Sequence, residues 1–550
     1  MSERHGGQIL VDHLKAFGVR RVFCVPGESF LAALDGLYGS GIETVVCRHE
    51  GGAAMMAEAH GKLTGAPGVA FVTRGPGACN ASAGIHVARQ DSTPMVLFVG
   101  QIARGHRDRE AFQEVDYRAM FAPLAKWVAE VDETERLPEY IARAWRIATS
   151  GRPGPVVLAL QEDVLSGVVE TTDRPVPPVD IPPDYRGAAE GITARLAEAE
   201  RPMIVAGGPL WSVQAAEDLA AFSEAWQIPV AVGFRRQDYL DNRHPCYAGD
   251  LNVGVNPRLG ERMRQADLLL VLGSRLGDIE TGGYERPDPL EAGPAILHVH
   301  ADAGEVGRVY AAEMAISAPA PPVLAALRDC AVTRRWEAWC AEARSDYERW
   351  ITPQETPGAV KLERIVNWLS DTLPEEAILT NGAGNYAAWL HRYFVYKRFG
   401  TQLAPTSGSM GYGFPAAIAA ALEHRGRPVV CFAGDGCFQM TLNETSTAAQ
   451  YGVDVTVIVV NNGRYGTIRM HQEKTYPGRV SGTELANPDF AALARAYGGQ
   501  GWVVERTDDF PAIYQEVADC SGLRIIELKV DPEALSTGQS LSDVRAAGKG

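Results

Sequence analysis

The chain has 550 residues, of which 46% are hydrophobic and 22% charged. It is therefore too long for a single hydrophobic core and too rich in core-forming residues to be disordered, and about three domains are expected. The formal net charge of −16 excludes nucleic acid as a partner, because phosphate backbones are bound through an excess of Lys and Arg. The sequence has neither a signal-peptide core nor an apolar run of membrane-spanning length, so we expect a cytoplasmic protein without a membrane partner.

The first segment, residues 1–168, alternates short β-branched runs with longer helical patterns. The predicted strands are residues 22–25, 44–47, 69–72, 95–99 and 156–160. Such alternation is typical of a parallel sheet covered by helices on both faces. A proline-rich stretch at residues 174–183 can continue neither a helix nor a central strand, so it is predicted to be a linker.

The same alternation returns twice further along the chain. Residues 186–335 contain predicted strands at 202–206, 229–232, 268–272 and 296–300, and residues 358–535 contain them at 377–380, 428–432, 455–460 and 523–528. The predicted fold class is therefore α/β, with three tandem doubly wound parallel-sheet domains. Residues 536–550 are expected to form a mobile tail.

Two polar motifs of the third domain follow predicted strands. The sequence Gly434-Asp435-Gly436 follows the strand at 428–432, and Asn461-Asn462 follows the strand at 455–460. The carboxyl ends of strands in an open parallel sheet share one edge, where ligands collect. Carboxylate and amide oxygens suit Mg²⁺, and glycines, together with a helix expected to begin after Gly436, suit phosphates. The two motifs therefore predict a site for a diphosphate held by magnesium.

The spacing of these motifs, with 24 residues (437–460) between them, resembles the signature of thiamine-diphosphate-dependent enzymes. The chain resembles the acetolactate synthase family along nearly its whole length. The resemblance implies a pyrimidine-binding first domain, a middle domain and a diphosphate-binding third domain, with thiamine diphosphate and Mg²⁺ as cofactors. The metal ligands that it implies are Asp435, Asn462 and the main-chain carbonyl of Arg464. The cofactor-binding residues that it implies are Glu50, Gly382, Gly384, Met410, Gly434, Asp435, Gly436 and Asn462.

In the first domain the resemblance singles out a carboxylate and two loops. Glu50 follows the strand at 44–47 and matches the residue that hydrogen-bonds the aminopyrimidine ring and promotes activation of the cofactor. Taken alone, Glu50 is equally a helix-capping residue. Gly27 matches a turn that approaches the substrate, and Gln113 a group that hydrogen-bonds it. Catalytic roles are thus expected for Glu50, Gln113 and Gly27.

The resemblance also places three residues in the substrate pocket. These residues are Phe112, Thr467 and His471, and His471 stands where acetolactate synthases carry a Trp that selects the acceptor. In the middle domain, Gly273-Ser274-Arg275 matches the position of an FAD or ADP pocket in relatives, but such turns persist in domains that bind nothing. Occupancy of the middle domain by FAD or ADP therefore stays open.

Three activities remain open from the sequence. The first is decarboxylation of a 2-oxo acid followed by carboligation to a second carbonyl compound. The second is a 2-oxo acid decarboxylase or a 2-hydroxyacyl or benzoin-type lyase, disfavoured because the sequence lacks the His-His pair of pyruvate decarboxylases. The third is a flavin-dependent pyruvate oxidase. By the resemblance, Glu50 of one subunit serves the diphosphate site of another, so the chain is expected to form at least a homodimer, within a homotetramer.

Overall fold

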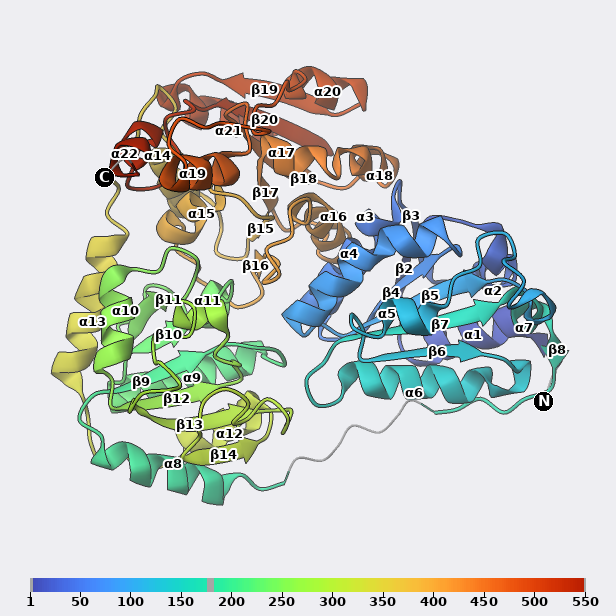
Figure 1. The fold of residues 1–550 in the computed structure, drawn as a ribbon, viewed down its shortest axis with the longest axis horizontal. Coiled ribbons are helices and arrows are strands. Elements are labelled where there is room, and N and C mark those ends of the chain that lie inside the picture. The colour runs from blue at the N-terminus through green and yellow to red at the C-terminus, as the bar shows by residue number, and fades with distance from the viewer. Residues whose placement is uncertain (1–2, 176–182, 549–550) are drawn as a thin grey trace.

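The computed structural model describes residues 3–175 and 183–548 and contains three α/β domains. Figure 1 shows the first domain at the right, the middle domain at the lower left and the third domain at the top. Each domain is built on a six-stranded sheet in which all neighbouring strands are parallel. The predicted fold class is confirmed. The predicted linker, residues 174–183, lies mostly outside the described residues.

The first sheet has the strand order β3-β2-β4-β5-β7-β6. Its central strands are buried along their whole length, as expected for a sheet covered on both faces. Its strands are β2 (Arg21–Cys24), β3 (Glu43–Val46), β4 (Gly68–Val72), β5 (Met95–Gln101), β6 (Trp127–Val131) and β7 (Pro155–Gln161). Its helices are α1 (Gly6–Ala16), α2 (Leu31–Leu37), α3 (Glu50–Thr64), α4 (Pro76–Asp91), α5 (Tyr117–Phe121), α6 (Leu137–Thr149) and α7 (Glu162–Ser166).

The middle sheet has the order β11-β10-β9-β12-β13-β14. Its strands are β9 (Pro202–Ala206), β10 (Val230–Val232), β11 (Tyr247–Asp250), β12 (Leu268–Leu272), β13 (Ala295–His300) and β14 (Met314–Ser317). Its helices are α8 (Arg186–Glu198), α9 (Val213–Trp226), α10 (Pro257–Gln265), α11 (Asp278–Thr281), α12 (Ala320–Arg328) and α13 (Glu337–Trp350).

The third sheet has the order β16-β15-β17-β18-β20-β19. Its strands are β15 (Ile378–Asn381), β16 (Gln402–Leu403), β17 (Val429–Gly434), β18 (Val455–Asn461), β19 (Gln500–Val504) and β20 (Leu523–Lys529). Its helices include α14 (Leu362–Thr372), α15 (Ala387–Tyr393), α16 (Gly413–Glu423), α17 (Asp435–Gln439), α18 (Thr445–Gln450), α19 (Gly466–Thr475), α20 (Phe490–Ala496) and α21 (Phe510–Ala518).

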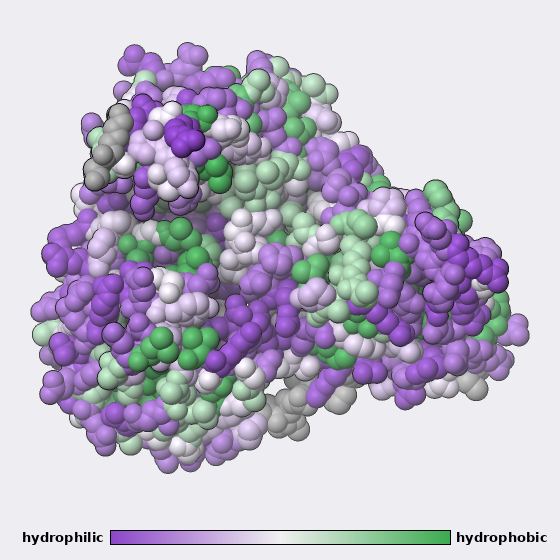
Figure 2. Space-filling model, viewed as in Figure 1, coloured by the Kyte–Doolittle hydropathy of each residue, from purple (hydrophilic) through white to green (hydrophobic). Residues whose placement is uncertain are grey.

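The first and third domains share one hydrophobic core. Alanine-rich faces of α3 and α16 pack against each other, and the buried cluster runs without a break from the first sheet to the third. Small side chains let the two helices approach closely. Figure 2 shows hydrophobic and near-neutral residues towards the middle of the visible face and a mostly hydrophilic rim. Among the described residues, no helix combines the length and the apolar character needed to cross a bilayer.

Two predictions from the sequence are wrong in detail. Residues 541–547 form helix α22 (Leu541–Ala547), where a mobile tail was expected. Ser540 caps this helix, and the Arg545 guanidinium pairs with the Glu473 carboxylate of α19 at 2.7 Å, which ties the segment to the domain. The helix expected to begin after Gly436 begins two residues earlier, at Asp435, and is only five residues long.

Candidate active site

The third domain carries a pocket at the point where its strand order reverses, between β15 and β17. Loops that follow β15, β17 and β18 line it, as expected for a ligand site in an open parallel sheet. The pocket brings together most of the residues predicted for the cofactor and the metal. Those that line it are Gly384, Met410, Gly434, Asp435, Gly436, Asn462 and Arg464.

Asp435 is held by several hydrogen bonds at the end of β17. Its Oδ1 accepts the main-chain N–H of Gly436 at 2.8 Å, and its Oδ2 accepts the N–H of Gly463 at 2.8 Å and the Nδ2 of Asn487 at 2.7 Å. Burial raises the pKa of Asp435, while these donors act in the opposite direction. Asn487 also donates to Asn461 Oδ1 at 2.8 Å, so it joins the ends of β17 and β18. Asn487 was not predicted, because it belongs to no motif.

The oxygen donors of the pocket fit a magnesium ion that is shared with a diphosphate. Asp435 offers a carboxylate and Asn462 an amide, and Arg464, whose N–H donates to Asn462 Oδ1 at 3.2 Å, follows in the same loop. Among the described residues no group of three His, Cys, Asp or Glu side chains could hold a metal. One carboxylate with neutral oxygens is what Mg²⁺ accepts when phosphates supply further ligands.

Glycines keep the pocket open beside its aromatic walls. A Cβ atom on Gly434 would lie 2.8 Å from the Tyr386 ring, and one on Gly436 would lie 2.6 Å from the Tyr465 ring. Gly384 has a φ of +142°, which side chains with a Cβ rarely adopt. The chain can therefore present main-chain atoms to a phosphate group here without a side chain in between.

Gly382 lies beside the pocket without lining it. Its N–H donates to Tyr386 Oη at 3.0 Å, and a Cβ there would lie 2.5 Å from Cys437 Sγ. Cys437 itself lines the pocket, and burial raises its pKa, so it presents a neutral thiol.

The two residues of α19 predicted for the substrate pocket lie differently. Thr467 lines the pocket, and its hydroxyl donates to Asn385 Oδ1 at 2.8 Å. His471, one helical turn further on, is exposed and lies outside the pocket lining. A second and larger cavity, lined by residues of all three domains, adjoins the pocket through Gly384, Asn385 and Thr467. That cavity gives the pocket an approach route.

Glu50 is the first residue of α3 and is 91% buried, with 9% of its surface exposed. Its Oε2 accepts the Nδ2 of Asn80 at 2.9 Å, and a Cβ on Gly77 would lie 3.2 Å from its Oε1. Gly27 follows β2 at the same edge of the first sheet, where a Cβ would lie 2.5 Å from Thr73 Cβ. Both residues thus lie near the reversal point of the first sheet, but neither lines the pocket of the third domain in this copy of the chain.

Phe112 and Gln113 project from the loop before α5. Phe112 is 75% exposed, which is unusual for a large aromatic side chain. Gln113 adopts a φ of +66° and packs against Gly75, and its buried Oε1 has no hydrogen-bond partner among the described residues. Neither residue lines the third-domain pocket in a single copy of the chain.

The middle sheet reverses its strand order between β9 and β12, and a carboxylate fills that position. Glu280 Oε2 accepts the Ser274 hydroxyl at 2.5 Å and the Gly277 N–H at 3.3 Å. A Cβ on Gly207 or Gly233 would lie 3.4 or 2.3 Å from Glu280 Oε1. A carboxylate at this position disfavours a diphosphate placed directly against these turns. A pocket remains beside Glu280, lined among others by Arg236, Ser274 and Arg275, so FAD or ADP in the middle domain stays an untested expectation.

Comparison with known proteins gives the same division into three domains. Family models of thiamine pyrophosphate enzymes match residues 4–120 (N-terminal TPP binding domain), 189–327 (central domain) and 382–528 (C-terminal TPP binding domain). The chain is 31% identical to the acetolactate synthase isozyme 2 large subunit of Escherichia coli K12 over 96% of both chains. It is 30% identical to the probable acetolactate synthase large subunit of Methanocaldococcus jannaschii, over 96% of this chain and 93% of that relative.

A third relative, the acetolactate synthase large subunit of Lactococcus lactis, is 30% identical over 90% of this chain and 87% of its own length. These matches run through all three domains and include the pocket at the end of β17. The chain is therefore an enzyme of the thiamine-diphosphate-dependent family, in which it is similar to the acetolactate synthase large subunits.

Proposed function

We propose that this enzyme uses thiamine diphosphate and Mg²⁺ to decarboxylate a 2-oxo acid such as pyruvate and to join the resulting acyl unit to a second carbonyl compound. The observation that carries the proposal is the third-domain pocket, in which Asp435, Asn462 and Arg464 lie together beside glycine-lined strand ends. The names of the relatives, acetolactate synthases, supply the reaction class.

Different residues of the pocket would bind the metal ion, the diphosphate and the rest of the cofactor. Asp435, Asn462 and the carbonyl of Arg464 hold the magnesium ion, and the loops at Gly384, Gly434 and Gly436 admit the diphosphate. Met410, which lines the pocket and packs against the third-domain core, supports the cofactor from below. When bound, thiamine diphosphate supplies a nucleophilic carbon and an electron sink for decarboxylation.

Glu50 would hold a proton at the aminopyrimidine ring of the cofactor. Because Glu50 does not line the pocket in its own chain, the active site needs Glu50 from a second copy, and the minimal active unit is a homodimer, within a homotetramer. The exposed face of α4, beside Glu50, supports this arrangement, because it carries no Asp, Glu, Lys or Arg. Its exposed residues are Pro76, Cys79, Asn80, Ala83, His86 and Gln90. Burying an uncharged face in an interface costs little desolvation free energy.

The same second copy would bring Gly27, Phe112 and Gln113 to the reacting groups. The buried Oε1 of Gln113 accepts no hydrogen bond from any described residue of its own chain. The apolar ring of Phe112 is exposed to solvent. Both observations support contact with substrate or with a partner subunit. Thr467 would border the donor side of the pocket.

One observation favours a lyase that releases an aldehyde as the second candidate. His471, which stands where acetolactate synthases have their acceptor-selecting Trp, is exposed and does not line the pocket. A His in place of that Trp means that the acceptor selection of acetolactate synthases does not carry over to this chain, which leaves release of an aldehyde as the alternative.

Incubation of the purified protein with thiamine diphosphate, Mg²⁺ and pyruvate separates these candidates. Carbon dioxide release together with acetolactate would support the carboligase, and acetaldehyde would support the lyase. A parallel sample with EDTA controls for the metal requirement. Absence of turnover with pyruvate and with longer or aromatic 2-oxo acids would contradict the proposal.

A further inference from the structure

The loop that follows β10 docks the middle domain onto both neighbouring domains. Gln237 donates from its Nε2 to the carbonyl of His391 at 2.7 Å, and Asp238 Oδ2 accepts the N–H groups of Gly400 and Thr401 at 2.9 and 3.0 Å. Both contacts reach the third domain, but neither reaches the loops that line the cofactor pocket. Within this loop, Arg235 makes a different kind of contact.

Arg235 extends from the middle domain to two loops of the cofactor site. Its guanidinium donates to the carbonyl of Gly382 at 2.9 Å and to the carbonyl of Pro405 at 2.5 Å. Gly382 begins the loop after β15, and Pro405 precedes the segment that leads to Met410. Arg235 adopts a φ of +58°, a conformation that is strained for a residue with a Cβ. The loop keeps this strain at the residue that makes these contacts.

The buried position of the Arg235 guanidinium is unfavourable for a charged group, because it removes the charge from water. Arg235 is only 5% exposed, burial lowers its pKa, and neither hydrogen-bond acceptor that it contacts is a carboxylate. A buried guanidinium is tolerated when its N–H groups are satisfied, and two main-chain carbonyls satisfy part of that need here. The Nε atom has no partner among the described residues.

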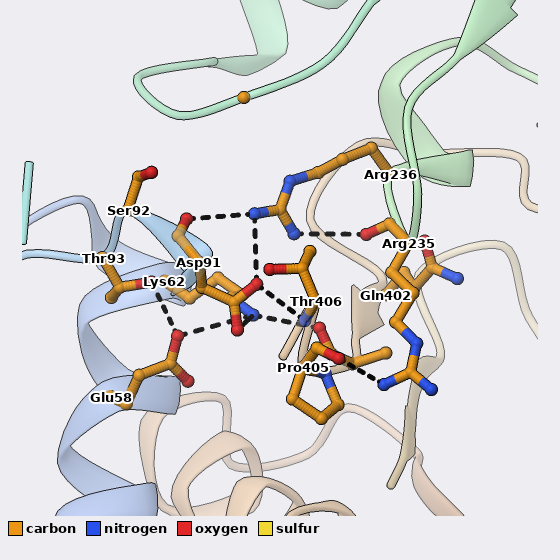
Figure 3. A network of polar contacts seen from close by, with 12 residues as sticks. Glu58, Lys62, Asp91, Ser92, Thr93, Arg235, Arg236, Gln402, Pro405 and Thr406 are labelled. Carbon is orange, nitrogen blue, oxygen red and sulfur yellow. Dashed lines mark hydrogen bonds and ion pairs between the residues drawn. The ribbon is translucent and has the colours of Figure 1, made fainter. Parts of the chain in front are cut away.

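Each of the two peptide units is held from both sides. In a trans peptide the C=O and N–H groups point in opposite directions. The Pro405 carbonyl is bound by Arg235, and the Thr406 N–H of the same peptide donates to Asp91 Oδ1 of the first domain at 3.0 Å (Figure 3). Lys62 pairs with Asp91 at 3.1 Å and keeps it anionic. Residues of the first and middle domains thus fix the start of the segment that carries Met410.

The second peptide unit faces the pocket directly. With the Gly382 carbonyl turned to Arg235, the N–H of Ala383 points the other way, towards the Cys437 thiol. Burial raises the pKa of that thiol, and the Ala383 N–H acts in the opposite direction. Ala383 and Cys437 both line the cofactor pocket. Rotation of this peptide would move the wall against which the diphosphate is expected to lie.

We propose that Arg235 is a positioning residue of the cofactor site, through which the middle domain sets the two loops that bind thiamine diphosphate. This role rests on the proposed function of the third-domain pocket. The middle domain then contributes to catalysis by holding these loops.

The test compares Arg235→Met with Arg344→Met in the full chain. Arg344 is the matched control, because it also donates to two main-chain carbonyls, those of Asn242 and His244 at 2.6 and 3.2 Å, but lies away from the cofactor loops. The Kd for thiamine diphosphate at saturating Mg²⁺ is measured by calorimetry, and the melting temperature without cofactor is measured beside it. We expect Arg235→Met to raise the Kd by about tenfold or more and Arg344→Met to leave it within about twofold.

Arg235→Lys covers the case in which Arg235→Met does not fold. Lysine keeps the charge but can reach only one of the two carbonyls, so we expect a Kd between those of the wild type and of Arg235→Met, at a nearly unchanged melting temperature. Wild-type affinity in Arg235→Lys and in any folded Arg235→Met protein would overturn the role of Arg235. A wild-type chain that did not bind thiamine diphosphate would instead overturn the proposed function, and this positioning role with it.

Discussion

The third and middle domains present the same edge of the same kind of sheet, but the side chains at the two edges differ. Both sheets reverse their strand order beside a central strand and end that strand in glycine-rich turns. In the third domain the turns border a pocket with Asp435 and Asn462 at its wall. In the middle domain Glu280 fills the equivalent position. Topology therefore decides where a ligand can bind, and individual side chains decide whether one does.

The largest expected effect comes from substitution of Glu50, the carboxylate that does not line the third-domain pocket of its own chain. Glu50→Gln should keep cofactor binding but lower kcat by roughly three orders of magnitude, because a neutral amide cannot take part in the proton transfer. Cofactor affinity, measured on the same variant, controls for damage to the site. Near-normal turnover would refute the role of Glu50.

Loss of the metal ligand should come next in size. Asp435→Ala should raise the Kd for thiamine diphosphate by about a hundredfold at limiting Mg²⁺, because it removes the anionic oxygen of the site. Asp489→Ala, which alters an exposed carboxylate of the same domain, is the control. If both variants retained cofactor equally well, the pocket would not be the metal site.

A substitution of Glu280 tests what this carboxylate does at the edge of the middle sheet. Glu280→Ala should destabilise the protein by about 1–3 kcal/mol, because the buried Ser274 hydroxyl loses its acceptor, while cofactor affinity stays unchanged. The melting temperature and the Kd for thiamine diphosphate report the two effects. Stoichiometric FAD or ADP in the purified wild-type protein, detected by absorbance and by chromatography after denaturation, would contradict the comparison between the two domains.

The smallest expected effect concerns a second buried carboxyl group at the same edge of the middle sheet. Burial raises the pKa of Asp250, at the end of β11, to about 7, whereas an unfolded chain releases this proton near pH 4. Between these values the folded state binds more protons than the unfolded state, so stability falls as pH rises from about 4 to about 7.

The Asp250→Asn variant should lack this contribution. Its melting temperature should fall less than that of the wild type between pH 5 and pH 8. Because one proton is involved, the free energies of unfolding of the two proteins can diverge by at most about 1.4 kcal/mol per pH unit. Parallel curves for the two proteins over this range would show that Asp250 does not titrate as its burial implies.

Central strands and edge strands differed in how well the sequence predicted them. Strands such as β9 and β12 were predicted to the residue, because strands buried on both faces read as continuous apolar runs. Within the three six-stranded sheets, five strands were not predicted, and all five lie at sheet edges: β6, β11, β14, β16 and β19. Such strands need less apolar surface or are very short, so no run of β-branched residues marks them.

The candidate site divides in the same way. Motif spacing predicted Asp435 and Asn462, and the pocket unites them with Gly384, Met410 and Thr467. His471 was also predicted for the substrate pocket; in a single copy of the chain it is exposed, one turn of α19 beyond Thr467, and its role stays a prediction. Asn487 joins Asp435 to Asn461 from a loop that no motif marks.

The sequence by itself determined three parallel-sheet domains and the loops where an oxygen-ligated metal is expected, because hydrophobic periodicity and motif spacing are local properties. Only the tertiary structure decided that Glu280 lies in the middle crevice, that Arg235 contacts two loops of the third domain and that α22 docks on α19. These contacts join residues whose meeting depends on how elements pack. A contact between side chains of different domains produces no repeating pattern in the sequence, so only the packing of the domains could reveal these contacts.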